Sequence, residues 1–322
     1  MYILLIFHLF YGIPKELNLV KNYRRSDLAC EAGEDLENIE GTRLTRHCRG
    51  GYEIEIIEIL TEDAARALGK KCGTYVTLST PEIWAIDDSE AEELSKIIGD
   101  ELRSIICSSL SINEITCDTS VLVVGLGNSM ITADSIGPLT LEEIDVTRHI
   151  RLLDPSLFAK LEVCEISAIA PGVLGNTGLE SAEMVKAACS RISPDVVIAI
   201  DALASSSIDR LARTFQFSDT GITPGAGIGN LRTELSRATL DVPVIAIGVP
   251  TVMDSSAVVF DALCRAGIEN EVPDELIAHL ERSERFYVTP KESDLMAERI
   301  SHILALAISN ALVINPPHHS YN

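Results

Sequence analysis

Three unbroken apolar runs constrain the fold more than any other feature of this 322-residue sequence. They cover residues 121–124, 196–200 and 244–247, and a weaker run covers residues 166–169. Unbroken apolar runs are typical of strands that are buried on both faces. Helical patterns separate the runs, and this alternation predicts a sheet with helices on both sides. We therefore expect an α/β fold in three layers, with a mostly parallel sheet.

Capping signals and amphipathic patterns indicate where the other elements lie. Thr61 precedes two acidic residues and predicts the start of a helix, because side-chain oxygens and negative charge both favour that end. Thr177-x-x-Glu180 and Thr289-Pro290-Lys291-Glu292 are predicted capping boxes of two further helices. The remaining predicted elements are strands at 53–60 and 75–78 and a helix at 89–110.

The first fifty residues differ from the rest of the chain. Residues 1–10 are almost all apolar, but no Lys or Arg precedes them, no small-residue cleavage site follows, and ten residues are too few to cross a membrane. We interpret them as a misassigned start or as an extension that is packed or removed. Residues 13–50 are polar and predict an irregular leader. Neither a repeat nor a long linker follows, so we expect one main domain.

Composition excludes several classes of protein. Hydrophobic residues make up 46% and charged residues 23%, which excludes disorder for most of the chain. The formal net charge of −22 argues against binding to nucleic acid or to an anionic membrane, because both require a basic surface. The eight cysteines include no C-x-x-C pair and no cluster with histidine, so we expect reduced thiols in a cytoplasmic protein without a zinc site.

Loops that follow buried parallel strands meet at one edge of a sheet, where ligands bind. Here these loops are 125–138, 201–205 and 248–251. The first opens with Gly-x-Gly, but Met130 occupies the position of the third glycine, which argues against a dinucleotide site. The glycine-rich segment 225–229 lacks the Lys-Ser/Thr of a phosphate loop, and its amides could equally bind a peptide or an oxyanion.

Two aspartates in these loops are the strongest catalytic candidates. Asp201 directly follows a buried apolar run, and Asp134 lies in the loop after another. Each could simply cap a helix, 202–210 in the case of Asp201. Alternatively, two nearby carboxyl groups can share a proton and activate water. A serine nucleophile is less favoured, because there is no Gly-x-Ser-x-Gly and no histidine close in sequence to 205–207.

These loops resemble those of the spore germination proteases, and the matching motifs occur in the family's order from about residue 25 to residue 312. The matching segments are Val123-Val-Gly-Leu-Gly-Asn128, Asp134-x-x-Gly137-Pro138, Ala170-Pro-Gly-Val173, Thr177-Gly178-x-Glu180, Ile198-Ala-Ile-Asp-Ala-Leu-Ala204, Pro224-Gly225-x-Gly227-x-Gly229-Asn230, Pro243–Val252 and Val288-Thr-Pro-Lys-Glu292. A more distant similarity joins this family to the hydrogenase-maturation endopeptidases.

The resemblance implies an endopeptidase that degrades small acid-soluble spore proteins when a spore germinates. It also implies a homotetramer in the spore core that is made as an inactive precursor and processes itself. The two family aspartates fall on Asp134 and Asp201, so we expect a two-aspartate mechanism without a cofactor. A metal bridging the two carboxylates is the alternative mechanism.

The family cuts after an acidic residue and before an apolar residue that is followed by Ala. Residues 26–31 of this chain, Ser-Asp-Leu-Ala-Cys-Glu, have that form. We therefore predict a leader at 1–27, self-cleavage between Asp27 and Leu28, and a peptidase domain at 28–322. Arg232 is the candidate partner of the acidic residue, and amides of Gly225, Gly227 and Gly229 are the candidate oxyanion donors.

Two segments depart from the family pattern: residues 1–14 match nothing expected, and 265–286 is shorter than in the longer members. Two other classes of function stay open at this point. A hydrogenase-maturation type of peptidase predicts a bound metal and a metalloprotein client, whereas a nucleotide-binding regulator predicts thermal stabilisation by nucleotide. Incubation with an acid-soluble spore protein separates the three.

Overall fold

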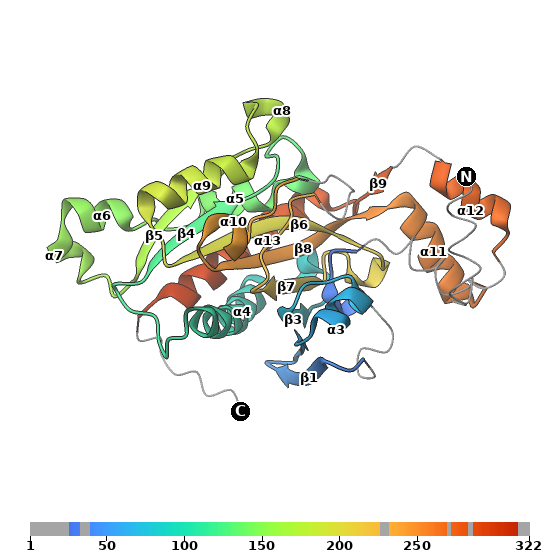
Figure 1. The fold of residues 1–322 in the computed structure, drawn as a ribbon, viewed down its shortest axis with the longest axis horizontal. Helices are drawn as coiled ribbons and strands as arrows, with labels where there is room; N and C mark the ends of the chain where they lie inside the picture. The colour runs from blue at the N-terminus through green and yellow to red at the C-terminus, as the bar shows by residue number, and fades with distance from the viewer. Residues whose placement is uncertain (1–25, 33–38, 226–231, 269–271, 283–285, 315–322) are drawn as a thin grey trace.

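The apolar runs form the central strands of one sheet (Figure 1). The computed structural model describes residues 26–32, 39–225, 232–268, 272–282 and 286–314. Strands β4 (Ser120–Gly125), β6 (Val196–Ser205) and β8 (Val244–Asp254) contain the three runs, and β5 (Glu165–Ile169) contains the weaker one. β4 lies between β5 and β6, β6 lies between β4 and β8, and all three pairings are parallel.

Successive residues of these strands enter two different cores, as the unbroken runs predict. In β4, Val121 and Val123 pack with α4 (Asp88–Leu110), α5 (Ile136–Glu142) and α13 (Ser293–Leu312). Leu122 and Val124 belong to the opposite core, with α9 (Ser181–Ile192) and α10 (Arg237–Leu240). Helices therefore cover both faces (Figure 1), and the predicted three-layer α/β class is confirmed.

The sheet is mixed rather than mostly parallel. Its order is β1-β2-β3-β7-β8-β6-β4-β5, with β9 paired to β8, and β3 spans Gly73–Ser79, β7 Thr214–Ser218 and β9 Tyr287–Val288. Five of the eight pairings between described strands are antiparallel. The hairpin of β1 and β2 is antiparallel because its connection is too short for a parallel crossover. Gly50 and Gly51, with φ of +55° and +82°, turn β1 (Thr42–Arg49) directly into β2 (Tyr52–Ile59).

β1 corrects the prediction of an irregular leader through residue 50. Most of its residues are exposed or half-buried, so the strand lacks the apolar pattern that identifies strands in sequence.

Two predicted helix starts differ in the structure. Glu180, not Thr177, is the N-cap of α9 and forms a capping box with Glu183. Helix α13 begins at Ser293, after the predicted box at 289–292. Thr61 does cap α3 (Glu62–Leu68) by accepting a hydrogen bond from Ala64 N at 3.2 Å.

The remaining elements connect or flank this framework. They are η1 (Ala29–Glu31), β3 (Gly73–Ser79), η3 (Ile83–Ala85), η4 (Thr132–Asp134), α6 (Arg148–Leu153), α7 (Pro155–Phe158), α8 (Leu174–Thr177), η5 (Ile208–Arg210), β7 (Thr214–Ser218), α11 (Ser255–Ala266), α12 (Asp274–Arg282) and β9 (Tyr287–Val288).

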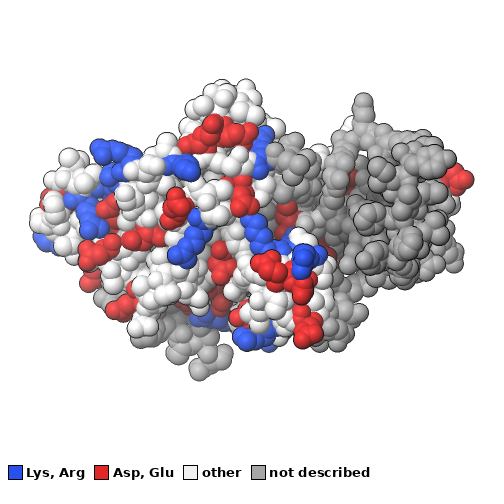
Figure 2. Space-filling model, viewed as in Figure 1, with Lys and Arg blue, Asp and Glu red and all other residues white. Residues whose placement is uncertain are grey.

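Charged side chains of both signs are scattered over the visible surface. Among the described residues on the face seen in Figure 2, Lys and Arg lie interspersed with Asp and Glu and form no basic patch. Within the described ranges, no helix is long and apolar enough to cross a membrane. The predictions for residues 1–25, Gly227 and Gly229 fall outside the described residues.

Candidate active site

The three loops predicted to share one edge of the sheet do meet there. Leu126 N, just past β4, donates a hydrogen bond to Ile200 O of β6 at 2.8 Å. The hydroxyl of Thr251, a fully buried residue of β8, donates to Ala133 O at 2.6 Å. Strands β6 and β8 therefore hold the loop that carries Asp134.

Asp134 does not cap a helix. It ends η4, and the N-cap of α5 is the next residue, Ser135. Asn128 N donates to the main-chain oxygen of Asp134 at 2.9 Å. Gly127 permits this close approach, because its φ is +114° and a Cβ there would lie 2.0 Å from Asp134 O. The Gly-x-Gly sequence thus packs against the Asp134 turn.

Asp201 lies inside a strand, which corrects the alternative that it caps a helix over 202–210. β6 continues to Ser205, and Asp201 pairs with Gly248 of β8. The residue is only 5% exposed, and its carboxylate accepts a hydrogen bond from Ala202 N at 2.9 Å. A buried carboxyl group in a central strand is costly unless it stays protonated or is paired.

Both carboxyl groups hold protons more tightly than usual. Burial raises the pKa of Asp134 to about 6, against the lowering effects of the Asn128 backbone and the charge of Arg232. Burial raises the pKa of Asp201 well above its usual range, and the negative charges of Asp134 and Asp27 raise it further. Of the two, Asp201 is the more deeply buried and therefore holds its proton more tightly, so Asp134 is the one that ionises first as pH rises.

Arg232 lies close enough to both aspartates for its charge to lower the pKa of each. Gly225, with φ of +70°, lines the same pocket as Asp201. Gly227 and Gly229 belong to the segment outside the described residues, so their predicted role as oxyanion donors stays a prediction, as does the pairing of Arg232 with a substrate acid.

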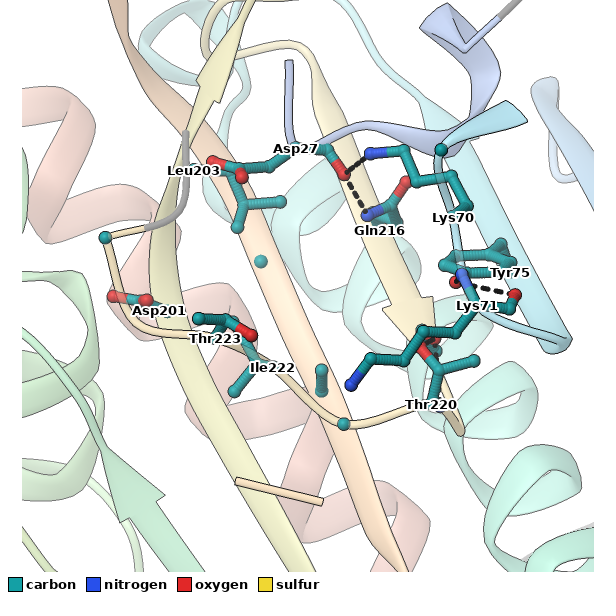
Figure 3. Close-up of a pocket in the computed structure, with 16 residues that line it drawn as sticks. Asp27, Lys70, Lys71, Tyr75, Asp201, Leu203, Gln216, Thr220, Ile222 and Thr223 are labelled. Atoms are coloured by element: carbon teal, nitrogen blue, oxygen red, sulfur yellow. Dashed lines mark hydrogen bonds between the residues drawn. The ribbon is translucent and has the colours of Figure 1, made fainter. Parts of the chain in front are cut away.

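The predicted processing site borders this pocket, a cavity of about 360 Å³ that Asp27 lines together with Asp201 (Figure 3). Asp27 N donates to Ala204 O at 3.0 Å, and Ala204 N donates to the Asp27 carboxylate at 2.9 Å. Leu28 is fully buried. The segment that has the form of a substrate thus binds to the last residues of β6, close to Asp201.

Glu31 binds a separate part of the same surface. Its carboxylate accepts hydrogen bonds from Ser205 Oγ at 2.9 Å, Ser206 N at 2.8 Å and Ser206 Oγ at 2.9 Å. Three donors on one carboxylate form a specific anion subsite. The serine run considered as a source of a nucleophile therefore binds an acidic side chain instead.

Two further residues contact the Asp27 carbonyl oxygen, and the sequence analysis did not identify either as part of the site. Lys70 Nζ donates to it at 2.9 Å, and Gln216 Nε2 donates at 3.2 Å. Gln216 stands out only as a polar residue between Phe215 and Phe217, and Lys70 as one of two adjacent lysines in an acidic chain. In the described part of the chain, no group of three or more His, Cys, Asp or Glu side chains could hold a metal ion.

Comparison with known proteins agrees with the motif resemblance. The model of the family described as germination protease matches residues 20–265. The germination protease of Clostridium tetani is 37% identical over 320 residues, which cover 89% of this chain and 95% of that protein. The germination protease of Priestia megaterium is 41% identical over 261 residues, which cover 78% and 69% respectively. The chain belongs to the germination protease family.

Other germination proteases span the chain almost completely. That of Bacillus subtilis is 33% identical over 356 aligned positions, covering 92% of this chain and 95% of that protein. Membership in the germination protease family indicates an endopeptidase of spore germination. The family match begins at residue 20, so it includes the segment that docks beside Asp201.

The raised pKa of Asp134 predicts a pH-dependent stability. Because the folded protein holds this proton more tightly than the unfolded chain, the free energy of unfolding falls as pH rises from about 4 through about 6. Asp134→Asn removes the titration. At pH 8 we expect the variant to be more stable by about 1–2 kcal/mol, allowing for solvent screening of a half-buried group. Thermal unfolding at pH 4 and pH 8 tests this, and a variant advantage that is equal at both pH values would contradict it.

Proposed function

We propose that this protein is the endopeptidase that starts the degradation of small acid-soluble spore proteins, and that it is made as a self-processing precursor. The observation that carries this proposal is the docking of residues 27–31 along the end of β6, where Asp27 lines the same pocket as Asp201 and bonds to Ala204, and where Glu31 bonds to Ser206. This segment presents the acid–apolar–Ala pattern that the resemblance implies for the substrate. A leader docked in this way takes the place of a substrate chain until it is cut, so residues 1–27 act as a propeptide and 28–322 as the peptidase.

In the proposed mechanism the two aspartates have different roles. Ionised Asp134 takes a proton from water as the water oxygen bonds to the substrate carbonyl carbon. Protonated Asp201 then gives its proton to the amide nitrogen, and the C–N bond breaks to leave a carboxyl and an amine terminus. Transfer of the proton on Asp134 back to Asp201 restores the pair. The pKa directions described above support this assignment, because Asp201 is the more deeply buried group.

Arg232 is the proposed charged partner of the acidic residue before the cut, in addition to the Ala204 amide. The support is positional, because both Arg232 and Asp27 lie near enough to Asp201 to change its pKa. We expect Arg232→Ala to raise KM for peptides with Glu before the cut by about tenfold, and to affect matched Gln peptides much less. An equal effect on both peptides, measured by steady-state kinetics, would rule out the charge pairing.

The three hydrogen bonds to Glu31 support a subsite for an acidic residue four positions after that acid. Ser206→Ala removes one hydroxyl donor and leaves the amide. Because hydrogen bonds to charged groups contribute about 1.5–3 kcal/mol, we expect kcat/KM for a Glu-containing peptide to fall about tenfold or more.

Ser190→Ala is the matched control for this subsite, because the Ser190 hydroxyl donates to Lys186 O on α9. The preference for Glu over Gln at this position of the peptide should shrink only in the Ser206 variant. An unchanged preference in Ser206→Ala would mean that these serines do not select the substrate.

The proposal also includes the spore core as the location, the homotetramer as the assembly and a mechanism without a cofactor. The test is incubation of the processed protein with a purified acid-soluble spore protein, followed by mass spectrometry of the products. We expect cuts after Glu or Asp and before an apolar residue followed by Ala. Intact substrate after long incubation would refute the function. Loss of cutting in a chelator, restored by one metal, would favour the metal-bridged alternative.

A further inference from the structure

The carbonyl oxygen of Asp27 accepts hydrogen bonds from two side chains that are far apart in the sequence. Lys70 Nζ lies 2.9 Å away and Gln216 Nε2 lies 3.2 Å away (Figure 3). In the proposed function this is the carbonyl of the bond that is cut. Its oxygen therefore gains negative charge when water adds to the carbonyl carbon.

Lys70 is positioned by the end of α3. Gly69 is the C-cap in the left-handed conformation, with φ of +64°, and Lys70 N then donates to Ala65 O at 3.1 Å. The side chain reaches the leader, where Nζ also donates to Ser26 O at 3.1 Å. Burial lowers the pKa of Lys70, but the carboxylates of Asp27 and Glu31 favour its charged form.

Gln216 is fixed more rigidly, because it is buried within the sheet. It belongs to β7 and pairs with Thr77 of β3 on one side and Gly248 of β8 on the other. Its amide contacts both sides of Leu28: Nε2 donates to Asp27 O, and Oε1 accepts a hydrogen bond from Ala29 N at 2.6 Å. One rigid side chain therefore sets the orientation of the Asp27–Leu28 peptide bond.

We propose that Lys70 and Gln216 form the oxyanion site of this enzyme, a role that the sequence had suggested for the glycine segment 225–229. This inference rests on the proposed function. A preorganised cation and amide aimed at the developing charge lower the barrier, and they need no rearrangement when the tetrahedral adduct forms. They also complement the aspartates, which move protons but leave the carbonyl oxygen unpaired.

The test is the first-order rate of self-cleavage in the full chain, measured by intact mass. We expect Lys70→Met to slow cleavage about a hundredfold to a thousandfold, since the loss of one oxyanion donor has effects of that size. Lys70→Arg keeps a cation and should retain activity within about tenfold of wild type. Gln216→Glu keeps the acceptor for Ala29 N but replaces the donor, and it should also be slow. Lys186→Met, which removes an exposed lysine from α9, is the control and should match wild type.

Hydrogen exchange of residues 26–32 separates catalysis from simple binding of the leader. Slow cleavage with unchanged protection of these amides supports the oxyanion role. Slow cleavage with lost protection in both Lys70→Met and Gln216→Glu shows that the two residues only hold the leader, and it overturns the inference. Cleavage of Lys70→Met within threefold of wild type overturns it too. If wild type itself never cleaves at Asp27, the proposed function fails first, and the inference fails with it.

Discussion

Asp134→Asn and Asp201→Asn are each expected to reduce peptidase activity by at least about a thousandfold, because general acid–base catalysis contributes up to about 10⁴ and the two groups act together. Neither change should disrupt the fold. Burial and the nearby negative charges raise the pKa of Asp201 and so favour its neutral form, which an amide of the same shape replaces with little electrostatic cost. Asp134 lies on a loop held through main-chain contacts, which its side chain does not make.

The measurement is kcat/KM on a peptide of the Asp-Leu-Ala form, together with a circular dichroism spectrum of each variant. Asp118→Asn is the control, because this exposed carboxylate near the opposite end of β4 pairs only with Arg151 among the described ion pairs. The double variant should be little worse than either single one, since residues that act as a unit are not additive. Full activity in either single variant would rule out the two-aspartate mechanism.

The parallel half of the fold could be predicted because its sequence signal is strong. A strand such as Val121–Val124 must be apolar at every position when helices cover both faces, and few other structures produce that pattern. The edge strand β1 gives no such signal. Its side chains are mostly exposed or half-buried, so its identity depends on pairing with β2, which the sequence of the strand alone does not encode.

The candidate site could be predicted only in part, for a related reason. Asp134 and Asp201 follow the buried runs, and the topology of parallel strands brings such positions together. Lys70 follows the C-cap of α3, and Gln216 lies on the antiparallel β7, which is separated from β6 only by β8, so the position of both depends on the mixed sheet. The alternative in which Asp201 caps a helix over 202–210 was wrong, because β6 continues past Asp201 to Ser205.

Self-cleavage between Asp27 and Leu28 is expected to give a mature chain that begins at Leu28. Tethering keeps the leader at a high effective concentration at the pocket, so the cut should be first-order and independent of protein concentration. Acidification to about pH 6 should promote the cut, since it relieves part of the self-repulsion in a chain of net charge −22. Below that pH the rate should fall, because Asp134, with a pKa of about 6, must be ionised to act as the base. Intact mass before and after a shift to mildly acidic pH gives the new terminus directly.

Variants of the leader and the site make this prediction specific. Asp134→Asn should stay full-length. Asp27→Ala should process at least about a hundredfold more slowly, because it removes the carboxylate that accepts from Ala204 N, whereas Asp27→Glu should process at a rate close to wild type. Glu40→Gln removes an exposed acid outside the docked segment and should behave as wild type. A mature chain that starts elsewhere, or processing that persists in Asp134→Asn, would show that this bond is not cut by the protein's own aspartates.

Processing at Leu28 would also place Leu28–Glu31 on the product side of the cut. These residues must therefore leave their contacts with Gln216 and Ser206 before a spore protein can bind there.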